Sequence, residues 1–288
     1  MEIEVKEEKN SKGKVTSSEA IITPGAEALV HGKNIDIVLQ FKMETVLELT
    51  SGISKTTKIE FSVNISSEKI LKELKKSKAG NVNAFIEIPK ELKDNKKVKD
   101  CNVILDKDVL KEAKKSGNNL KVAIGDGNDS EKKVCEWTFS KKALKNAKNF
   151  KDLDLSMNIQ KPETNKNTDL GKILNSLRTD DSKTYEQIMK NSVVCSLGNN
   201  GELGCEAEVK MYVDDYAKQN VPYYLYYANP KTSKLEEMPC KPMKVKNGFL
   251  SAKLKHCSDY IFTDKKLSAD VATPLQNQIK GIASSKQI

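Results

Sequence analysis

The sequence predicts an α+β protein that is rich in β-strand and has two domains. Three observations point to this class: apolar and polar residues alternate along most of the chain, helical patterns are few, and 288 residues exceed the usual size of one core. In KIEFSVNIS, residues 58–66, Ile59, Phe61 and Val63 share one face and Glu60 lies on the other. This alternation is typical of half-buried strands.

Other segments alternate in the same way and are predicted strands. They are IDIVLQF (35–41), VNAFIEI (82–88), LKVAIGD (120–126), KVCEWTF (133–139), LDLSMNI (153–159) and AEVKMYV (207–213). With the helices among them, they predict an N-terminal α+β domain over residues 1–160. Trp137 shares a strand face with Cys135 and Phe139 and is expected in the core.

Two lysine-rich helices are predicted over residues 66–80 and 106–117. Each begins with Ser or Asp, which are typical N-caps, and ends in lysines followed by Gly80 or Gly117. ILKELKKS in the first resembles VLKEAKKS 39 residues later, and each lies between strand patterns. This predicts duplicated strand–helix–strand units within residues 58–125. The open alternative is that short lysine-rich helices resemble one another by composition alone.

The C-terminal half predicts a different architecture. Residues 161–169 are polar, contain Pro162 and lack periodicity, which predicts an interdomain linker. Short helical patterns follow in LGKILNSL and YEQIMKN, and from residue 192 the pattern is strands and tight turns. We expect an antiparallel all-β, sandwich-like domain over residues 170–265 and a flexible tail over residues 266–288.

Composition limits the possible partners. The formal charge is +9, but Arg178 is the only arginine among 49 basic residues. Arginine is favoured for bidentate contacts to bases and phosphates, so we expect no nucleic-acid partner. No apolar run approaches the length of a membrane span, which predicts no membrane insertion. Residues 1–15 are charged and carry no export signal.

Six cysteines suggest disulfides. Cys195 and Cys205 flank Asn199, Asn200 and Gly201, and a three-residue hairpin loop there would place the two cysteines opposite each other. A two-residue turn at Asn200 and Gly201 would break this opposition and leave two thiols. A second turn at 247–248 suggests pairing of Cys240 with Cys257, and elimination leaves Cys101 with Cys135. Even one such bridge predicts an oxidising, extracellular setting.

Motifs for metals, cofactors or catalysis are weak. The cysteines lack the clustered spacing of zinc sites, so neither a metal nor another cofactor is expected. HCSDY, residues 256–260, is not a plausible triad, because strand neighbours point to opposite faces. DGNDS, residues 126–130, departs from the EF-hand pattern and predicts a hairpin turn, although loose calcium coordination by Asp126 and Asn128 stays open.

The run VPYYLYYANP, residues 221–230, is the richest in aromatic residues. Tyr224 and Tyr226 share one strand face and are candidate ligand-binding residues, because exposed tyrosines stack on sugars or anchor protein interfaces. The alternative is that both faces of this strand are covered, or that a phenol holds a turn.

The run YYLYYANPKTSKLEEMPCKPMKVKNGFLSAKLKHCSDYIFTDK, residues 223–265, resembles modules of secreted multidomain surface proteins from clostridia and other gut Firmicutes. Residues 103–139, with VLKEAKKSG before strands that end in WTF, resemble the same family. The pair Cys195 and Cys205 departs from that pattern, whereas Cys257 matches it. The resemblance implies an exported, cell-envelope or extracellular module and gives no residue a role.

Together these features predict a non-enzymatic extracellular or cell-surface protein of a Gram-positive bacterium. Its expected role is adhesion, spacing, or binding of a glycan or of a host or cell-wall protein. Two alternatives remain: a secreted carbohydrate-active or peptide-processing enzyme with an unrecognised carboxylate pair, and a cytosolic scaffold with six reduced thiols.

Overall fold

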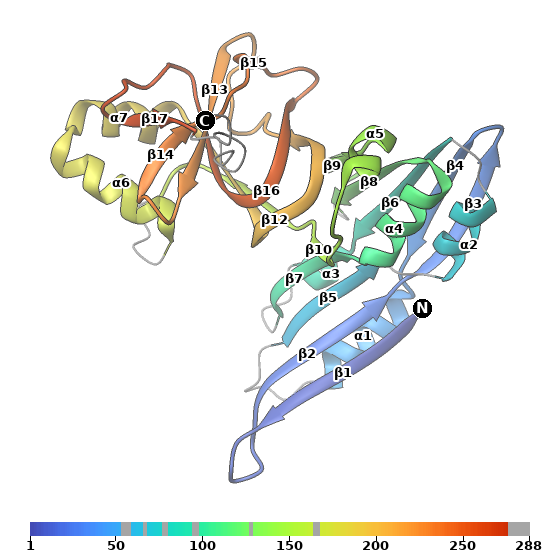
Figure 1. The fold of residues 1–288 in the computed structure, drawn as a ribbon. Coiled ribbons are helices and arrows are strands. Elements are labelled where there is room, and N and C mark those ends of the chain that lie inside the picture. Colours follow the sequence, from blue (N-terminus) through green and yellow to red (C-terminus); the bar gives the residue numbers. More distant parts are fainter. Residues whose placement is uncertain are drawn as a thin grey trace, which may run out of the picture. The chain divides into compact units, whose positions relative to one another are not determined.

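The computed structural model describes residues 1–52, 59–65, 68–76, 80–93, 98–126, 129–163 and 168–275 (Figure 1). The chain divides into two compact units. The first comprises residues 1–157, 197–212 and 251–257, and the second comprises the intervening segments and the remainder. The sequence predicts one division at 161–169, of which residues 164–167 lie outside the description. In the structure the long strands β12 (Val193–Tyr212) and β16 (Phe249–Thr263) contribute to both units.

A five-stranded sheet lies in the first unit. Its order is β1 (Glu2–Lys9), β2 (Val15–Thr23), β5 (Ile59–Ile65), β7 (Val98–Leu105) and β10 (Leu153–Asp154). The central strands β2, β5 and β7 are parallel, and the outer strands are antiparallel to them. Helices α1 (Met43–Gly52) and α3 (Lys90–Lys93) bury Val46 and Leu92 in the apolar cluster of this sheet, with Ala20, Ile22 and Phe61.

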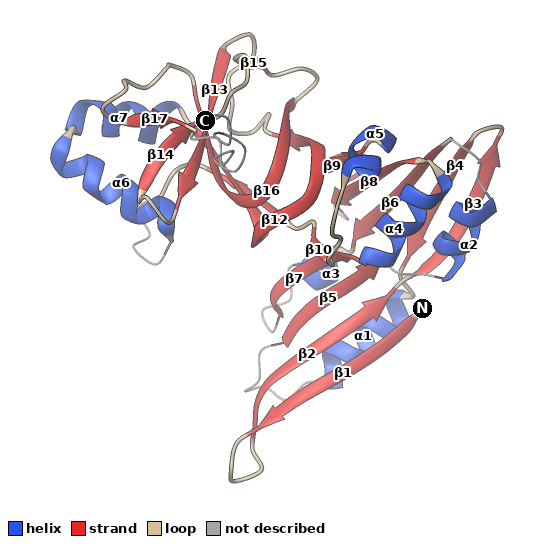
Figure 2. Cartoon of the chain, in the orientation of Figure 1, coloured by secondary structure: helices blue, strands red, loops and turns tan. Residues whose placement is uncertain are grey.

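A second sheet begins in the same unit. Its strands there run in the order β3 (Gly25–His31), β4 (Asn34–Gln40), β6 (Asn81–Ile88), β8 (Asn119–Asp126) and β9 (Asp129–Phe139), followed by β12. Strands β4, β6 and β8 are parallel. Helix α2 (Glu68–Lys76) contacts α4 (Lys107–Ser116), which in turn contacts α5 (Lys141–Asn146). Figure 2 shows the predominance of strand, so the predicted β-rich α+β class is confirmed.

The two segments predicted as a duplication have the same order of elements, β5–α2–β6 and β7–α4–β8. Equivalent strands are adjacent and parallel. Helix α4 has the predicted ends: Asp106 accepts a hydrogen bond from the Asp108 amide, and Gly117 has a φ of 69°. A positive φ is accessible to glycine without strain, which explains why the helix ends there.

Asparagines join the N-terminal ends of the three parallel strands. Asn81 donates to the side chain of Asn34 at 2.9 Å, and Asn119 donates to Asn81 at 2.8 Å. The last acceptor, Asn119 Oδ1, receives the amide of Lys141 at 2.8 Å. At the same end, Gly80 donates its amide to Asn118 Oδ1 at 2.7 Å.

The second unit packs helices on a sheet. Strands β13 (Pro222–Asn229) and β14 (Lys234–Glu237) lie between β16 and β17 (Ala272–Pro274), while β11 (Met157–Gln160) pairs with β12 and β15 (Met243–Lys244) with β13. Helices α6 (Asp169–Asp180) and α7 (Ser182–Asn191) share an apolar cluster with β13, β14 and β16. The prediction of an all-β domain over residues 170–265 is therefore wrong, since α6 and α7 cover this sheet. The pairs of β13 with β14, β15 and β16 are antiparallel, as predicted, and the parallel pair of β14 with β17 lies beyond residue 265.

The fold also tests the predictions for Trp137 and for the tail over residues 266–288. Trp137 is fully buried and donates its indole N–H to the Leu155 carbonyl at 3.1 Å, which confirms its place in the core. The predicted tail begins as ordered structure, because Leu267 and Val271 are buried and β17 follows; residues 276–288 lie outside the description. Within the described ranges, no helix is long and apolar enough to cross a membrane.

Candidate functional site

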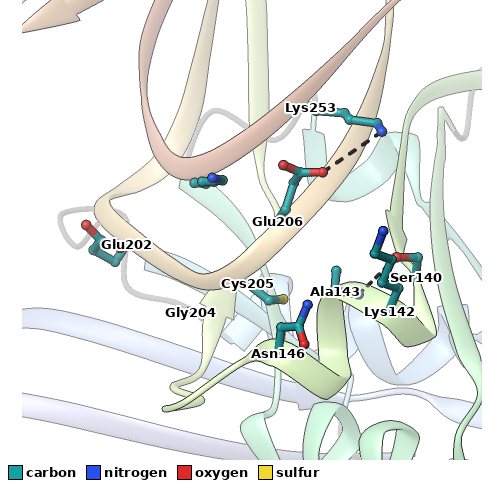
Figure 3. Close-up of a pocket in the computed structure, with 10 residues that line it drawn as sticks. Ser140, Lys142, Ala143, Asn146, Glu202, Gly204, Cys205, Glu206 and Lys253 are labelled. Carbon is teal, nitrogen blue, oxygen red and sulfur yellow. Dashed lines mark hydrogen bonds and ion pairs between the residues drawn. The ribbon is translucent and has the colours of Figure 1, made fainter. Parts of the chain in front are cut away.

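A polar surface groove of about 510 Å³ lies in the first unit, between α5 and neighbouring parts of β12 and β16 (Figure 3). Its lining is mostly charged or hydrogen-bonding. The lining residues are Ser140, Lys142, Ala143, Asn146, Glu202, Gly204, Cys205, Glu206, Lys253 and Lys255. A groove of this composition suits a polar ligand better than an apolar one.

Local sequence explains how α5 and β12 meet. Ser140 caps α5 by accepting a hydrogen bond from the Ala143 amide at 3.1 Å. On β12, Gly204 has a φ of 76°, and a Cβ there would overlap the carbonyl oxygen of Asn149. Glycine is therefore needed at 204, both for the backbone conformation and for the close approach of the segment after α5.

The charges in the groove are solvated. Lys253 and Glu206 form an ion pair at 4.0 Å, and their side chains are 70% and 42% exposed. In Figure 3 the Glu206 carboxylate points toward Lys253, and Glu202 lies apart from that pair. An exposed pair of this kind contributes little to stability, so its charges remain available to a ligand.

Cys205 contributes the thiol in the groove lining. Burial raises its pKa to about 11. The side chain is therefore a neutral thiol near pH 7, and the thiolate is the reactive form of cysteine. Among the described residues, burial is the one cause that shifts the pKa of Cys205, and no neighbouring charge lowers it.

A second hollow of about 460 Å³ lies in the same unit, beside the last turns of α4. Four lysines and an aromatic ring dominate its lining, which comprises Lys111, Lys114, Lys115, Lys148, Asn149 and Phe150. Asn149 belongs to this hollow, and Gly204 of the groove approaches its carbonyl oxygen, so the two depressions are neighbours.

Two of the four lysines are held by internal contacts. Lys114 donates to the Ala147 carbonyl at 2.7 Å, and its Nζ lies 5.9 Å from the centre of the Phe150 ring. Lys111 is 2.7 Å from Asp108, and this hydrogen bond lowers the pKa of Asp108. Among the described residues, Lys115 and Lys148 make no ion pair. The hollow therefore carries positive charge that is not neutralised internally.

The predicted disulfide pairs are wrong. None of the six cysteines, all of which the structure describes, forms a disulfide. The expected hairpin at 199–201 does not form, because β12 continues from Val193 to Tyr212. Cys195 and Cys205 are ten residues apart along it, and a strand rises about 3.3 Å per residue, so they cannot face each other.

The other two predicted pairs do not form either, because their cysteines lie in different environments or on different sheets. Cys240 is exposed, whereas Cys257 is buried on β16, where burial raises its pKa to about 11. Cys101 lies on β7 of the five-stranded sheet. Cys135 lies on β9 of the other sheet, where burial raises its pKa to about 12.

The predicted tyrosine platform is wrong for Tyr226. Tyr226 is fully buried in the cluster with α6, and its phenol oxygen accepts the Leu267 amide at 2.8 Å. Tyr224 is half-buried against the same cluster. On the opposite face, Tyr223 is also buried and accepts the Lys218 amide at 2.8 Å. These phenols hold chain segments in place, which is the alternative that the sequence left open.

The remaining sequence hypotheses concern metals. The side chains around Asp126 and Asn128 fall outside the described residues. Elsewhere in the described chain, no group of three or more His, Cys, Asp or Glu residues could hold a metal ion. Neither the groove nor the lysine hollow was predicted from the sequence. The spacing of Lys111, Lys114 and Lys115 along one helix was the available signal, and it was common to many lysines of the chain.

The chain was compared with protein-family models, curated proteins and solved structures. No protein-family model, curated protein or solved structure matches this chain.

Proposed function

We propose that this chain is a non-catalytic binding module whose ligand is a negatively charged polysaccharide. One observation carries the proposal: the two neighbouring hollows of the first unit present seven lysines and two glutamates. Carboxylate, sulfate or phosphate groups on a sugar chain would complement this excess of positive charge. The Phe150 ring and the amides of Asn146 and Asn149 add contacts suited to sugar rings and hydroxyl groups.

Lysine chemistry favours a polymer with dispersed charges. Lysine acts as a flexible point charge, whereas arginine provides the planar fork used for bidentate recognition of bases and phosphates. A ligand held by several solvated lysines binds through the sum of weak contacts, each worth up to about 1 kcal/mol. We therefore place an anionic glycan before a nucleic acid.

We also propose that the module acts outside the cell, attached to the surface or secreted. The support for this location is the resemblance of residues 223–265 to modules of exported surface proteins. The cysteines no longer support it, because no bridge joins them within the described chain. Protease treatment of intact source cells tests the location: loss of the protein without lysis is expected, and full protection would contradict it.

The binding test is isothermal titration calorimetry, which measures the dissociation constant of the full chain for a sulfated or carboxylated polysaccharide at low ionic strength. Lys115→Glu and Lys148→Glu are each expected to weaken binding about threefold to fivefold, since one solvated contact is lost and one repulsion is gained. Added salt is expected to weaken the wild-type interaction, because exposed charges are screened.

Lys12→Glu is the matched control, because Lys12 is exposed in the turn between β1 and β2 and the change in net charge is the same. A neutral polysaccharide controls for contacts that do not depend on charge. Equal weakening by Lys12→Glu would show that only net charge matters and would refute the site. Tighter binding of single-stranded DNA than of the polysaccharide would change the ligand class.

A further inference from the structure

An exposed sheet edge in the first unit is distinct from the charged hollows. Strand β3 is the last strand of its sheet, and among the described strands it pairs with β4 alone, in a register from Gly25 opposite Gln40 to His31 opposite Asn34. On its outer side, alternate residues of such a strand present backbone N–H and C=O groups to solvent.

The side chains of β3 do not protect this edge. Leu29 is 52% exposed and Val30 is 60% exposed, and they are two of the four exposed large hydrophobic residues in the described chain. Glu27 is the only carboxylate on the strand, and β3 carries no lysine. Natural sheets block their edges with charges, lysines above all, or with proline, and within its length β3 has no lysine or proline and carries Glu27 as its one carboxylate.

The other long edge of the first unit shows the contrast. Strand β1 is the outer strand of the five-stranded sheet, and its sequence is EIEVKEEK. Six of these eight residues are charged, and Val5 is the exposed apolar residue among them. One edge is therefore protected against strand addition, and the other is open to it.

We propose that β3 pairs antiparallel with β3 of a second copy of this chain and forms a symmetric dimer. A two-fold axis at Leu29 places Leu29 opposite Leu29 of the second copy. It places each Glu27 opposite His31, and each Ala28 opposite Val30. Carboxylate and imidazole can hydrogen-bond across the strands, and small residues lie opposite large ones, so the segment complements itself.

Charge favours an axis at Leu29 over an axis at Ala28, and favours pairing of β3 with β3 over pairing with β1 of another copy. An axis at Ala28 would place each Glu27 opposite Leu29 and bring the two Glu27 carboxylates to diagonal positions. Pairing of β3 with β1 of another copy would place a row of Glu and Lys side chains against Leu29 and Val30, and would continue into an open chain of copies. The symmetric register avoids both.

The test is sedimentation velocity of the full chain over about a hundredfold range of concentration, because a weak dimer forms by mass action. The wild type is expected to move from 32.1 kDa toward twice that mass. Leu29→Lys is expected to weaken dimerisation about tenfold or more, since it introduces two facing charges at the axis. Val5→Lys, the same change at the β1 edge, is expected to leave the dimer intact.

A charge exchange tests the register. His31→Glu faces Glu27 of the second copy and is expected to weaken the dimer, whereas the double variant Glu27→His with His31→Glu is expected to restore it. Circular dichroism and thermal unfolding of each variant show that the monomer still folds. A wild type that stays monomeric, equal loss with Val5→Lys, larger open assemblies, or no restoration by the double variant would each overturn the proposal.

Discussion

Glu136 provides the sharpest test of the energetics of the first unit. It lies on β9 with 6% of its surface exposed, and its carboxylate lies between two lysines of the adjacent strands. Lys210 of β12 lies directly opposite and donates at 3.1 Å, and Lys121 of β8 approaches to 3.3 Å. Burial alone would raise the pKa of Glu136, but the hydrogen bond from Lys210 and the charge of Lys121 outweigh it and hold that pKa below its usual value.

Glu136→Gln keeps the shape of the side chain and removes its charge. Both lysines are partly exposed, at 38% and 44%, so water replaces part of the lost interaction. We expect a loss of about 1–2 kcal/mol in the free energy of unfolding at pH 7. Thermal unfolding followed by circular dichroism should show a midpoint lower by about 2–8 °C.

The pH dependence separates charge from shape. Because the native pKa of Glu136 lies below its unfolded value of about 4.3, the stabilisation is complete above that value and is lost as the pH falls through the native pKa. The difference in the free energy of unfolding between the wild type and Glu136→Gln should therefore disappear under acid conditions. Glu4→Gln, which removes a surface pair with Lys6 at 3.8 Å, is the control and should change little. A loss of unfolding free energy that does not change with pH, or that is equal for Glu136→Gln and Glu4→Gln, would refute this explanation.

Three further predictions concern other parts of the chain. Gly80→Ala is expected to destabilise the protein by about 3 kcal/mol or more in urea unfolding, because the new Cβ would overlap the backbone carbonyl of Lys33. Tyr226→Phe is expected to cost about 1–2 kcal/mol, since it leaves the buried Leu267 amide without its acceptor. In thiol titration with an aromatic disulfide reagent, the exposed Cys240 should react fastest, and Cys135 should react only on unfolding.

Matched controls accompany these changes. Gly25→Ala meets no atom nearer than 3.7 Å and should be tolerated, and Tyr224→Phe alters a phenol that is half-buried rather than enclosed. Equal effects of the variant and its control would remove the steric argument for Gly80 or the hydrogen-bond argument for Tyr226. Fewer than six thiols after denaturation without reductant would show that bridges form in the protein and would overturn the assignment of six thiols.

Local sequence determined much of the first unit. Period-2 alternation predicted β4, β5, β6 and β8. In β4 and β6 one face is buried and the other is less so, whereas β8 is buried on both faces. The ends of α4 followed from Asp106 and Gly117, since capping depends on residues within one turn of the helix. These features need no knowledge of distant segments.

The candidate site needed the tertiary structure. Its groove joins Lys142 of α5, Glu206 of β12 and Lys253 of β16, residues that are far apart in the sequence. Sequence patterns describe each of these elements separately, and none of them specifies which elements become neighbours. The lysine hollow is similar, because lysines occur throughout the chain and only packing beside Phe150 distinguishes Lys114.

By itself, the sequence determined that the chain is β-rich, where its strands alternate, how α4 begins and ends, and that Trp137 is buried. Only the tertiary structure decided that β12 continues past Asn199, where the local signal favoured a turn, and that α6 covers Tyr226. The physical reason is the range of the interactions: caps and alternation depend on residues a few positions apart, whereas strand pairing and burial depend on segments brought together from distant parts of the chain.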